Sequence, residues 1–103
     1  MQRLVQLAKI FSDINRVKIL ALCLRDKELC VCEICDTLEL SQPLVSRHLK
    51  QMREAGVLTS AQKGKWVIYS LTKTPDIVLE CWSKEVTKEL SSLPSLVGCN
   101  IKT

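Results

Sequence analysis

Apolar residues recur at helical spacing through the first forty positions of the chain. One set predicts a helix over about residues 3–12, and a second set predicts a helix that Ser12 and Asp13 would cap. Polar residues at 25–28 interrupt the pattern, after which a third helix is indicated from about Val31. The apolar positions are Leu4, Leu7, Ala8 and Phe11, then Val17, Leu20, Ala21 and Leu24, then Val31, Ile34, Cys35 and Leu38.

A fourth predicted helix has clear start and stop residues. Ser41 is a favoured cap, and Pro43 falls within the first turn, where a missing backbone donor has little effect. Gly56 predicts an end near residue 55, because glycine readily adopts the left-handed conformation that follows many helices. One side of this helix is apolar and the other polar. The inward positions are Val45, His48, Leu49 and Met52, and the outward ones are Pro43, Ser46, Arg47, Lys50 and Gln51.

From residue 57 onward the period changes from helical to alternating. A β-branched and aromatic run, in which Val67, Tyr69 and Leu71 alternate, pairs with residues 57–62 across Lys63 and Gly64, which predicts a β-hairpin with a basic tip. A last helix then opens with cap, proline and acid in the favoured order and continues to Pro94. The residues that carry these two patterns are Val67, Tyr69 and Leu71, then Thr74, Pro75 and Asp76.

This order of elements predicts the fold class. Two short helices joined by a tight turn and followed at once by a hairpin form a winged helix-turn-helix. The chain is therefore expected to be mainly α with a β-hairpin (α+β), in the order of four helices, two strands and one helix. We expect a single domain over 1–103, with the helix-turn-helix at about 31–55 and the wing at 57–71.

The outward face of the fourth helix carries side chains that suit DNA. Gln42 and Arg47 can make paired hydrogen bonds to base edges, and lysines at the wing tip can hold phosphates. The alternative interpretation is an amphipathic helix whose polar face only meets solvent. The hairpin that follows directly makes this interpretation weaker. For His48, DNA contact and packing at the core edge both remain open, and Trp66 fits wing packing better than base stacking. The candidate DNA-binding residues are Ser41, Gln42, Ser46, Arg47, His48, Lys50, Lys63 and Lys65.

Composition adds limits to this picture. The 103 residues are 47% hydrophobic and 4% aromatic, enough for one core, and a small chain gains from a dimer partner that covers apolar faces. The net charge of +4 and the pI of about 8.8 are compatible with a surface that binds phosphate, but charge alone does not establish DNA binding. The absence of a spanning run or a signal peptide predicts a cytoplasmic protein with no membrane partner.

Three of the six cysteines cluster at the start of the helix-turn-helix, as Cys30, Cys32 and Cys35. Soft thiolates select soft ions, and three sulfurs without a nearby histidine suit a three-coordinate centre better than tetrahedral zinc. On a helix, Cys32 and Cys35 lie roughly 60° apart, whereas Cys30 lies about 160° from Cys32. Either Cys30 precedes the helix in an extended segment, or the first turn distorts when the ion binds. Such a rearrangement would couple ligand binding to the fourth predicted helix, which is the one expected to read the DNA bases.

Other interpretations of the cysteines stay open. Cys32 and Cys35 could form a redox dithiol, although the strand-helix-strand context of that motif is absent, or half of a zinc knuckle whose other pair is missing. Cys35 could also be a core residue, as Cys23 and Cys81 are expected to be, and Cys99 is either an accessory ligand or an idle thiol. An enzyme such as a thiol oxidoreductase is disfavoured, because no nucleophile stands beside a base.

Three segments together resemble the ArsR/SmtB family of metal-sensing repressors, and within it the arsenical-resistance branch. They are Glu-Leu-Cys-Val-Cys-Glu-Ile-Cys at 28–35, Leu-Ser-Gln-Pro-Leu-Val-Ser-Arg-His-Leu at 40–49 and Gly-Lys-Trp-Val-Ile-Tyr at 64–69. The resemblance implies a homodimer whose interface is formed by the helices at about 3–12 and 75–93. It also implies binding to an inverted-repeat operator in double-stranded DNA with no cofactor and no small organic substrate, and release by As(III) or Sb(III) at Cys30, Cys32 and Cys35.

Departures from other branches narrow the implied ligand. The zinc sensors of the family carry His and Asp ligands on the last helix, whereas the one histidine here is His48, in the fourth helix. The cadmium and lead sensors lack a cysteine at the position of Cys35 and draw further ligands from a longer N-terminal arm. The resemblance therefore favours an arsenite- or antimonite-responsive repressor, with a redox-sensing or a Cd/Pb-sensing winged-helix repressor as the alternative.

Overall fold

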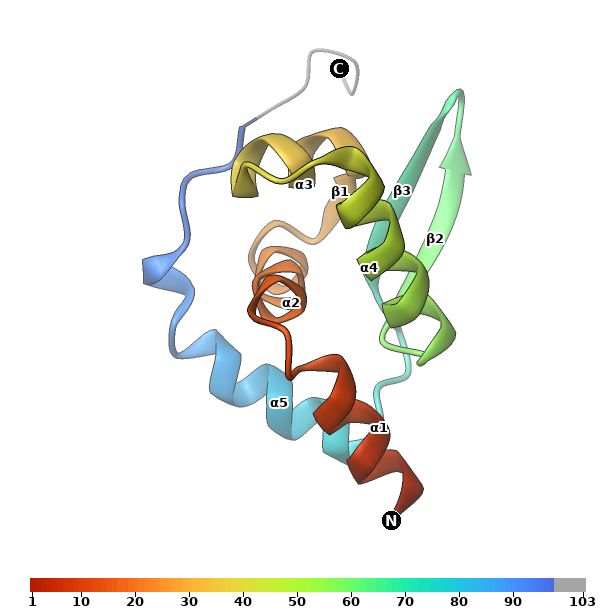
Figure 1. Cartoon of the computed structure of the whole chain (residues 1–103), viewed down its shortest axis with the longest axis vertical. Helices are drawn as coiled ribbons and strands as arrows, with labels where there is room; N and C mark the ends of the chain where they lie inside the picture. The colour runs from red at the N-terminus through yellow and green to blue at the C-terminus, as the bar shows by residue number, and fades with distance from the viewer. Residues whose placement is uncertain (98–103) are drawn as a thin grey trace.

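A computed structural model of the chain describes residues 1–97. Helix α2 lies at the centre, and the other helices and the sheet surround it (Figure 1). The hairpin of β2 and β3 extends beyond α4. In chain order the elements are α1 (Gln2–Ile10), α2 (Ile14–Asp26), β1 (Glu28–Cys30), α3 (Val31–Leu38), α4 (Gln42–Glu54), β2 (Leu58–Lys63), β3 (Trp66–Leu71), α5 (Ile77–Thr87) and a 3-10 helix (Leu90–Ser92).

The core forms around α2 because apolar side chains cover most of its circumference. Ile19, Leu20 and Leu22 are fully shielded from solvent and belong to the central hydrophobic cluster. Burying each of these side chains stabilises the fold by about 1.5–3 kcal/mol. The helix lies against α3, α4, α5, β1 and β3, so a single core holds together α4, the hairpin and the last helix.

The predicted cap of α2 at Asp13 is confirmed, whereas the last helix is capped by Asp76 rather than by the predicted Thr74. The Asp13 side chain accepts a 2.8 Å hydrogen bond from the Asn15 N–H at the start of α2. The Asp76 side chain likewise accepts a 2.9 Å bond from the Leu79 N–H at the start of α5. Each carboxylate satisfies one of the backbone donors that a helix start leaves unpaired, and it also interacts favourably with the helix dipole.

The sheet contains one strand more than the predicted hairpin. Its order is β1-β3-β2, with both pairs antiparallel, so β3 lies between the hairpin partner β2 and the short strand β1. Within β1, Leu29 pairs with Tyr69 and Cys30 pairs with Ile68. Three residues are too few to show an alternating pattern in the sequence, and Leu29 is held by its burial in the core. The winged helix-turn-helix fold is confirmed, with this strand added.

The last helix is shorter than the predicted span of 75–93. It ends at Thr87, and a 3-10 turn follows before Leu93 adopts an extended backbone. Leu93 precedes Pro94, whose ring disfavours a helical conformation at the residue before it. The chain then returns to α3, where the Val97 N–H donates a 2.9 Å hydrogen bond to Oγ1 of Thr37. Within residues 1–97, no helix has the length and apolar character needed to cross a membrane.

Candidate DNA-reading face and thiol site

Helix α4 presents the polar face that the sequence predicts. Oγ of Ser41 caps the helix by accepting a 3.4 Å hydrogen bond from the Leu44 N–H, and Pro43 lies in the first turn. Gly56 follows the helix with a φ of 75°, which is the predicted left-handed stop. The apolar side is buried through Val45, Leu49 and Met52. The exposed residues on the other side include Ser41, Gln42, Ser46, Arg47 and Lys50.

His48 lies on the buried side of α4, with 3% of its surface exposed. Its Nε2 is 3.9 Å from Oδ2 of Asp13, and neither ring nitrogen has a hydrogen-bond partner. Burial lowers the pKa of His48, Asp13 opposes that shift, and the guanidinium groups of Arg16 and Arg47 add to it. Of the two interpretations of His48, its position favours packing over DNA contact.

The wing ends in the predicted basic tip. Lys63 and Lys65 are exposed on either side of Gly64, which has a φ of 62°. Nζ of Lys63 lies 2.5 Å from Oε2 of Glu28, so the wing is tied to the strand that leads to the cysteines. Glu28 is not identifiable as a partner from the sequence, because 35 positions separate the two charges and only the sheet brings them together. Both side chains are about half exposed, so the ion pair adds little stability.

The junction of β1 and α3 positions the three predicted ligand cysteines. Cys30 is both the last residue of β1 and the N-cap of α3, with an extended backbone (φ −90°, ψ 163°). Of the two arrangements that the spacing allowed, the extended segment before the helix is therefore the one adopted. Oε1 of the buried Glu33 accepts a 3.0 Å hydrogen bond from the Cys30 N–H, which fixes the first turn as a capping box.

A hollow of about 520 Å³ opens beside these cysteines, and we call it the thiol hollow. It reaches from α3 across the turn to the first residue of α4 and to the start of β3. This shape places the predicted ligands next to both α4 and the wing, the two elements predicted to contact DNA. Its lining residues are Cys30, Val31, Cys32, Cys35, Asp36, Leu40, Gln42, Trp66 and Val67.

The three thiols are not gathered into a ready ion site. Among residues 1–97, no group of three His, Cys, Asp or Glu side chains is arranged to hold a metal ion. Cys30 is 3% exposed, whereas Cys32 and Cys35 are half-buried on α3. Cys30 and Cys35 are free thiols, and Cys32 is disulfide-bonded. Three-coordinate binding therefore requires reduced Cys32 and a rearrangement of the three thiols.

The thiol of Cys35 and the cysteines outside the predicted ligand set have different surroundings. Burial raises the pKa of Cys35, and the neighbouring Asp36 carboxylate raises it further. Cys23 lies in the core, as predicted, and its burial raises its pKa to about 12. The prediction that Cys81 packs in the core is wrong, because its thiol is exposed on the outer side of α5. Cys99 lies outside the described residues.

A second surface of interest is the apolar face shared by α1 and α5. Leu4 is 58% exposed and Ile77 is 73% exposed. They line one shallow apolar hollow of about 420 Å³ together with Val78, Cys81 and Trp82. Isolated exposed apolar residues are ordinary, but a contiguous patch of this kind is typical of a protein interface.

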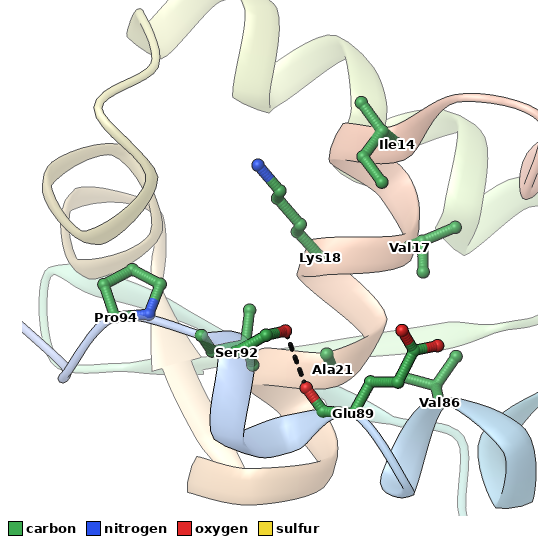
Figure 2. Close-up of a pocket in the computed structure, with 9 residues that line it drawn as sticks. Ile14, Val17, Lys18, Ala21, Val86, Glu89, Ser92 and Pro94 are labelled. Atoms are coloured by element: carbon green, nitrogen blue, oxygen red, sulfur yellow. Dashed lines mark hydrogen bonds between the residues drawn. The ribbon is translucent and has the colours of Figure 1, made fainter.

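A smaller hollow of about 180 Å³ lies between α2 and the segment that follows α5 (Figure 2). Ile14, Val17 and Lys18 line it from α2, and a 2.8 Å hydrogen bond from Oγ of Ser92 to the carbonyl of Glu89 closes the opposite side. No cysteine and none of the candidate DNA-binding residues lines it. It is therefore separate from both the thiol hollow and the exposed face of α4.

Comparisons with known proteins agree with this geometry. Residues 13–60 match the family described as "Bacterial regulatory protein, arsR family". The chain is 42% identical over 101 residues to the arsenical resistance operon repressor of Escherichia coli (strain K12), a match that covers 93% of this chain and 86% of that protein. It is 52% identical over 63 residues to the arsenic resistance transcriptional regulator ArsR1 of Pseudomonas putida.

The match to the Pseudomonas putida protein covers 61% of this chain and 49% of that protein, so it spans about half of that relative's length. Among solved structures, HlyU from Vibrio cholerae N16961 is similar with a TM-score of 0.74 and 28% sequence identity. That match covers 85% of this chain and 91% of the HlyU chain. The similarity extends beyond the helix-turn-helix to most of the fold.

Proposed function

Because this chain belongs to the ArsR family of bacterial regulatory proteins, we propose that it is an arsenite- or antimonite-responsive transcriptional repressor. It is a DNA-binding regulator rather than an enzyme. In the proposal, a homodimer binds operator DNA in the cytoplasm without a cofactor. Binding of As(III) or Sb(III) by Cys30, Cys32 and Cys35 then releases it. The observation that carries this proposal is that all three cysteines line one hollow shared with Gln42 and Trp66.

The DNA half of the proposal rests on the exposed face of α4. Gln42 and Arg47 have the planar groups that make paired hydrogen bonds to adenine and guanine edges in the major groove. Ser46 and Lys50 lie on the same exposed side, and Lys65 at the exposed wing tip can reach a phosphate. Lys63 would exchange its contact with Glu28 for a phosphate when DNA binds.

A dimer explains the apolar face of α1 and α5. A two-fold contact would bury Leu4, Ile77 and their neighbours against the same residues of a second copy. It would also present two α4 helices to an inverted-repeat operator, whose half-sites lie about one helical turn apart.

Release follows from the position of Cys30. A ligand that draws the Cys30 sulfur toward Cys32 and Cys35 would disturb the capping box, in which the Cys30 side chain faces the backbone of Glu33, and with it the first turn of α3. Since α3 packs against α4, this disturbance reaches the reading helix. Ligand and DNA then weaken each other's binding reciprocally, with a coupling free energy of about 1–3 kcal/mol.

One observation favours a second candidate function. Cys32 is disulfide-bonded in this structure, so oxidation of this cysteine is an alternative way to change α3. A thiol-based redox repressor would respond to peroxide and to reductant rather than to As(III). A Cd/Pb-responsive repressor is a further variant, and it differs in requiring thiolates that bind a divalent cation.

Fluorescence anisotropy of the reduced protein on DNA from its own promoter tests these alternatives. We expect arsenite and antimonite to release the DNA, and cadmium, zinc and peroxide to leave it bound. Cys32→Ser should keep the DNA affinity and lose the release, whereas Cys23→Ala, which removes a core thiol outside both the hollow and the proposed dimer face, should keep the DNA affinity and the release. Indifference to arsenite would contradict the proposal, and release by peroxide alone would establish the redox candidate.

A further inference from the structure

One guanidinium group joins three helices of the fold. Arg3 lies in the first turn of α1, and its Nε donates a 2.5 Å hydrogen bond to Oδ2 of Asp76, at the start of α5. Its Nη1 donates a 2.5 Å bond to the carbonyl oxygen of Ala55, at the end of α4, and a 2.9 Å bond to Oε1 of Gln6. The contacts with Ala55 and Asp76 span 52 and 73 positions, so they belong to the tertiary fold.

The carbonyl of Ala55 lies at the junction of α4 and the wing. Helix α4 ends at Glu54, Ala55 is its C-cap, and β2 begins at Leu58. The last carbonyls of a helix have no partner within the helix, and a cation is favourable beside them because the helix dipole is negative at that end. Ala55 is 6% exposed, so water has little access to this junction. Arg3 therefore holds the point at which α4 ends and the wing begins.

Asp76 fixes the direction of the Arg3 side chain. Its Oδ1 accepts the capping bond from the Leu79 N–H, while its Oδ2 accepts the bond from Arg3. The bond from Leu79 and then the bond from Arg3 lower the pKa of Asp76, which keeps the carboxylate ionised. The side chains of Arg3 and Asp76 are 30% and 43% exposed, so this ion pair adds little to the free energy of unfolding. Its main effect is on the geometry of the three helices.

The same ion pair adjoins the apolar face of α1 and α5. Leu4 follows Arg3 in the chain and Ile77 follows Asp76, and both apolar side chains line the hollow of that face. Helices α1 and α5 lie together at the end of the molecule opposite the tip of the wing (Figure 1). The main packing contacts of α4, by contrast, are with α2, α3 and β2. The Arg3 side chain thus links the end of α4 directly to the apolar face.

We propose that Arg3 is a positioning residue for DNA binding, which holds the end of α4 at a fixed place relative to the apolar face of α1 and α5. This inference rests on the proposed dimer, in which that face joins the two copies. Two α4 helices engage both halves of an inverted repeat only when their separation matches that of the half-sites. A fixed separation makes the second half-site contact intramolecular and tightens binding, and a variable separation reduces that gain.

Fluorescence anisotropy of the full, reduced chain on three duplexes tests the inference. The duplexes carry the inverted repeat of its own promoter, a single half-site, and the inverted repeat with two base pairs inserted at its centre. Arg3→Ala should weaken binding to the inverted repeat about tenfold and binding to the half-site less than about threefold, because two charge-assisted hydrogen bonds that position α4 are lost. It should also lose most of the preference for the natural spacing over the insertion.

Two further variants separate the geometry of Arg3 from its charge. Arg3→Lys keeps the positive charge but lacks the planar fork that reaches two acceptors, so it should restore only part of the lost affinity. Lys9→Ala is the matched control, since it removes one positive charge from an exposed position of the same helix. It should change the affinity for every duplex less than about twofold, as is usual for an exposed residue outside the contact. Circular dichroism and sedimentation equilibrium measure the folding and dimerisation of each variant.

The outcomes separate this inference from the proposed function. Equal losses on the inverted repeat and the half-site, or no loss on either, overturn the inference and leave the proposed repressor standing. A loss that follows from weaker dimerisation also overturns it, because Arg3 would then act at the dimer contact itself. A selective loss on the inverted repeat, in a chain whose DNA binding ignores arsenite, supports the inference and contradicts the proposed arsenic response. A monomeric wild-type chain contradicts the proposed dimer and overturns the inference with it.

Discussion

The reading helix and the thiol segment lie side by side, but they differ in how complete they are. Helix α4 already has its Ser41 cap, its buried side and its exposed polar side. At the β1–α3 junction, by contrast, Cys30 is committed to the sheet and to the cap of α3, and the described residues contain no assembled group of three ligands.

This difference indicates that the folded chain favours the conformation proposed to bind DNA over the conformation that would bind a three-thiol ligand. In the proposed mechanism, DNA binding needs no change in the cap or the buried side of α4, whereas a three-thiol ligand disturbs the cap of α3. The free energy of the disturbed contacts, foremost the capping box of Cys30 and Glu33, would supply the opposition between ligand and DNA. Changes in α4 and changes at the β1–α3 junction should therefore have different effects.

The largest expected effect comes from emptying the buried side of α4. Leu49 is fully buried, so Leu49→Ala should lower the free energy of unfolding by about 2–5 kcal/mol through lost burial and an unfilled cavity. Urea denaturation followed by circular dichroism measures the loss. The neighbouring Lys50→Ala, on the exposed side, should change stability by less than about 0.5 kcal/mol. Equal losses in both variants would show that α4 is not anchored in this way.

The next effect separates base reading from phosphate anchoring. Arg47→Ala should weaken operator binding by about 1–3 kcal/mol and relax sequence specificity. Lys63→Ala should weaken binding to all sequences alike and reduce the slope of affinity against salt by about one. Anisotropy on operator and scrambled DNA at several salt concentrations distinguishes the two patterns. A common pattern for both variants would remove the division between helix and wing.

Glu33 tests whether the cap of α3 resists three-thiol binding. Glu33→Ala should destabilise the fold by about 1 kcal/mol, as the loss of a helix cap does. It should also let arsenite release DNA at roughly fivefold lower concentration, since about 1.4 kcal/mol corresponds to tenfold. Glu33→Gln is the matched control, because glutamine can accept the same hydrogen bond. An unchanged arsenite midpoint in Glu33→Ala would show that the cap does not oppose the ligand.

The smallest expected effect is a pH dependence from His48. Burial lowers its pKa in the folded chain, so the unfolded chain binds more protons below its ordinary pKa of about 6.5. The contribution of neutral His48 to the free energy of unfolding is complete above a pH of about 6.5. It is lost as the pH falls from there toward the lower pKa that His48 has in the folded chain. His48→Asn, which removes the one histidine, should flatten urea midpoints measured between pH 7.5 and 5.5. A slope that persists in the variant would contradict its assignment to His48.

Much of the fold follows from local sequence. The periods of 3.6 and 2 predict the helices and the hairpin, and the caps at Asp13 and Ser41 are confirmed because each bonds a backbone group two or three residues away. For the last helix the cap is Asp76, two residues after the predicted Thr74. The outward face of α4 and the place of the cysteine cluster at the start of α3 are likewise local properties.

The remaining features depend on contacts between distant parts of the chain. Strand β1 exists because β3, about forty positions later, supplies its partner, and the same pairing buries Cys30. His48 is buried beside Asp13, at the start of α2, and the contact of Lys63 with Glu28 crosses the sheet. Local residue order thus specifies the helices, the hairpin and two of the caps. It also places the cysteine thiols beside the helix predicted to read DNA. That Cys30 caps α3 and that Trp66 lines the hollow with the thiols depend on long-range packing, because packing free energy sums over residues that are distant in the chain.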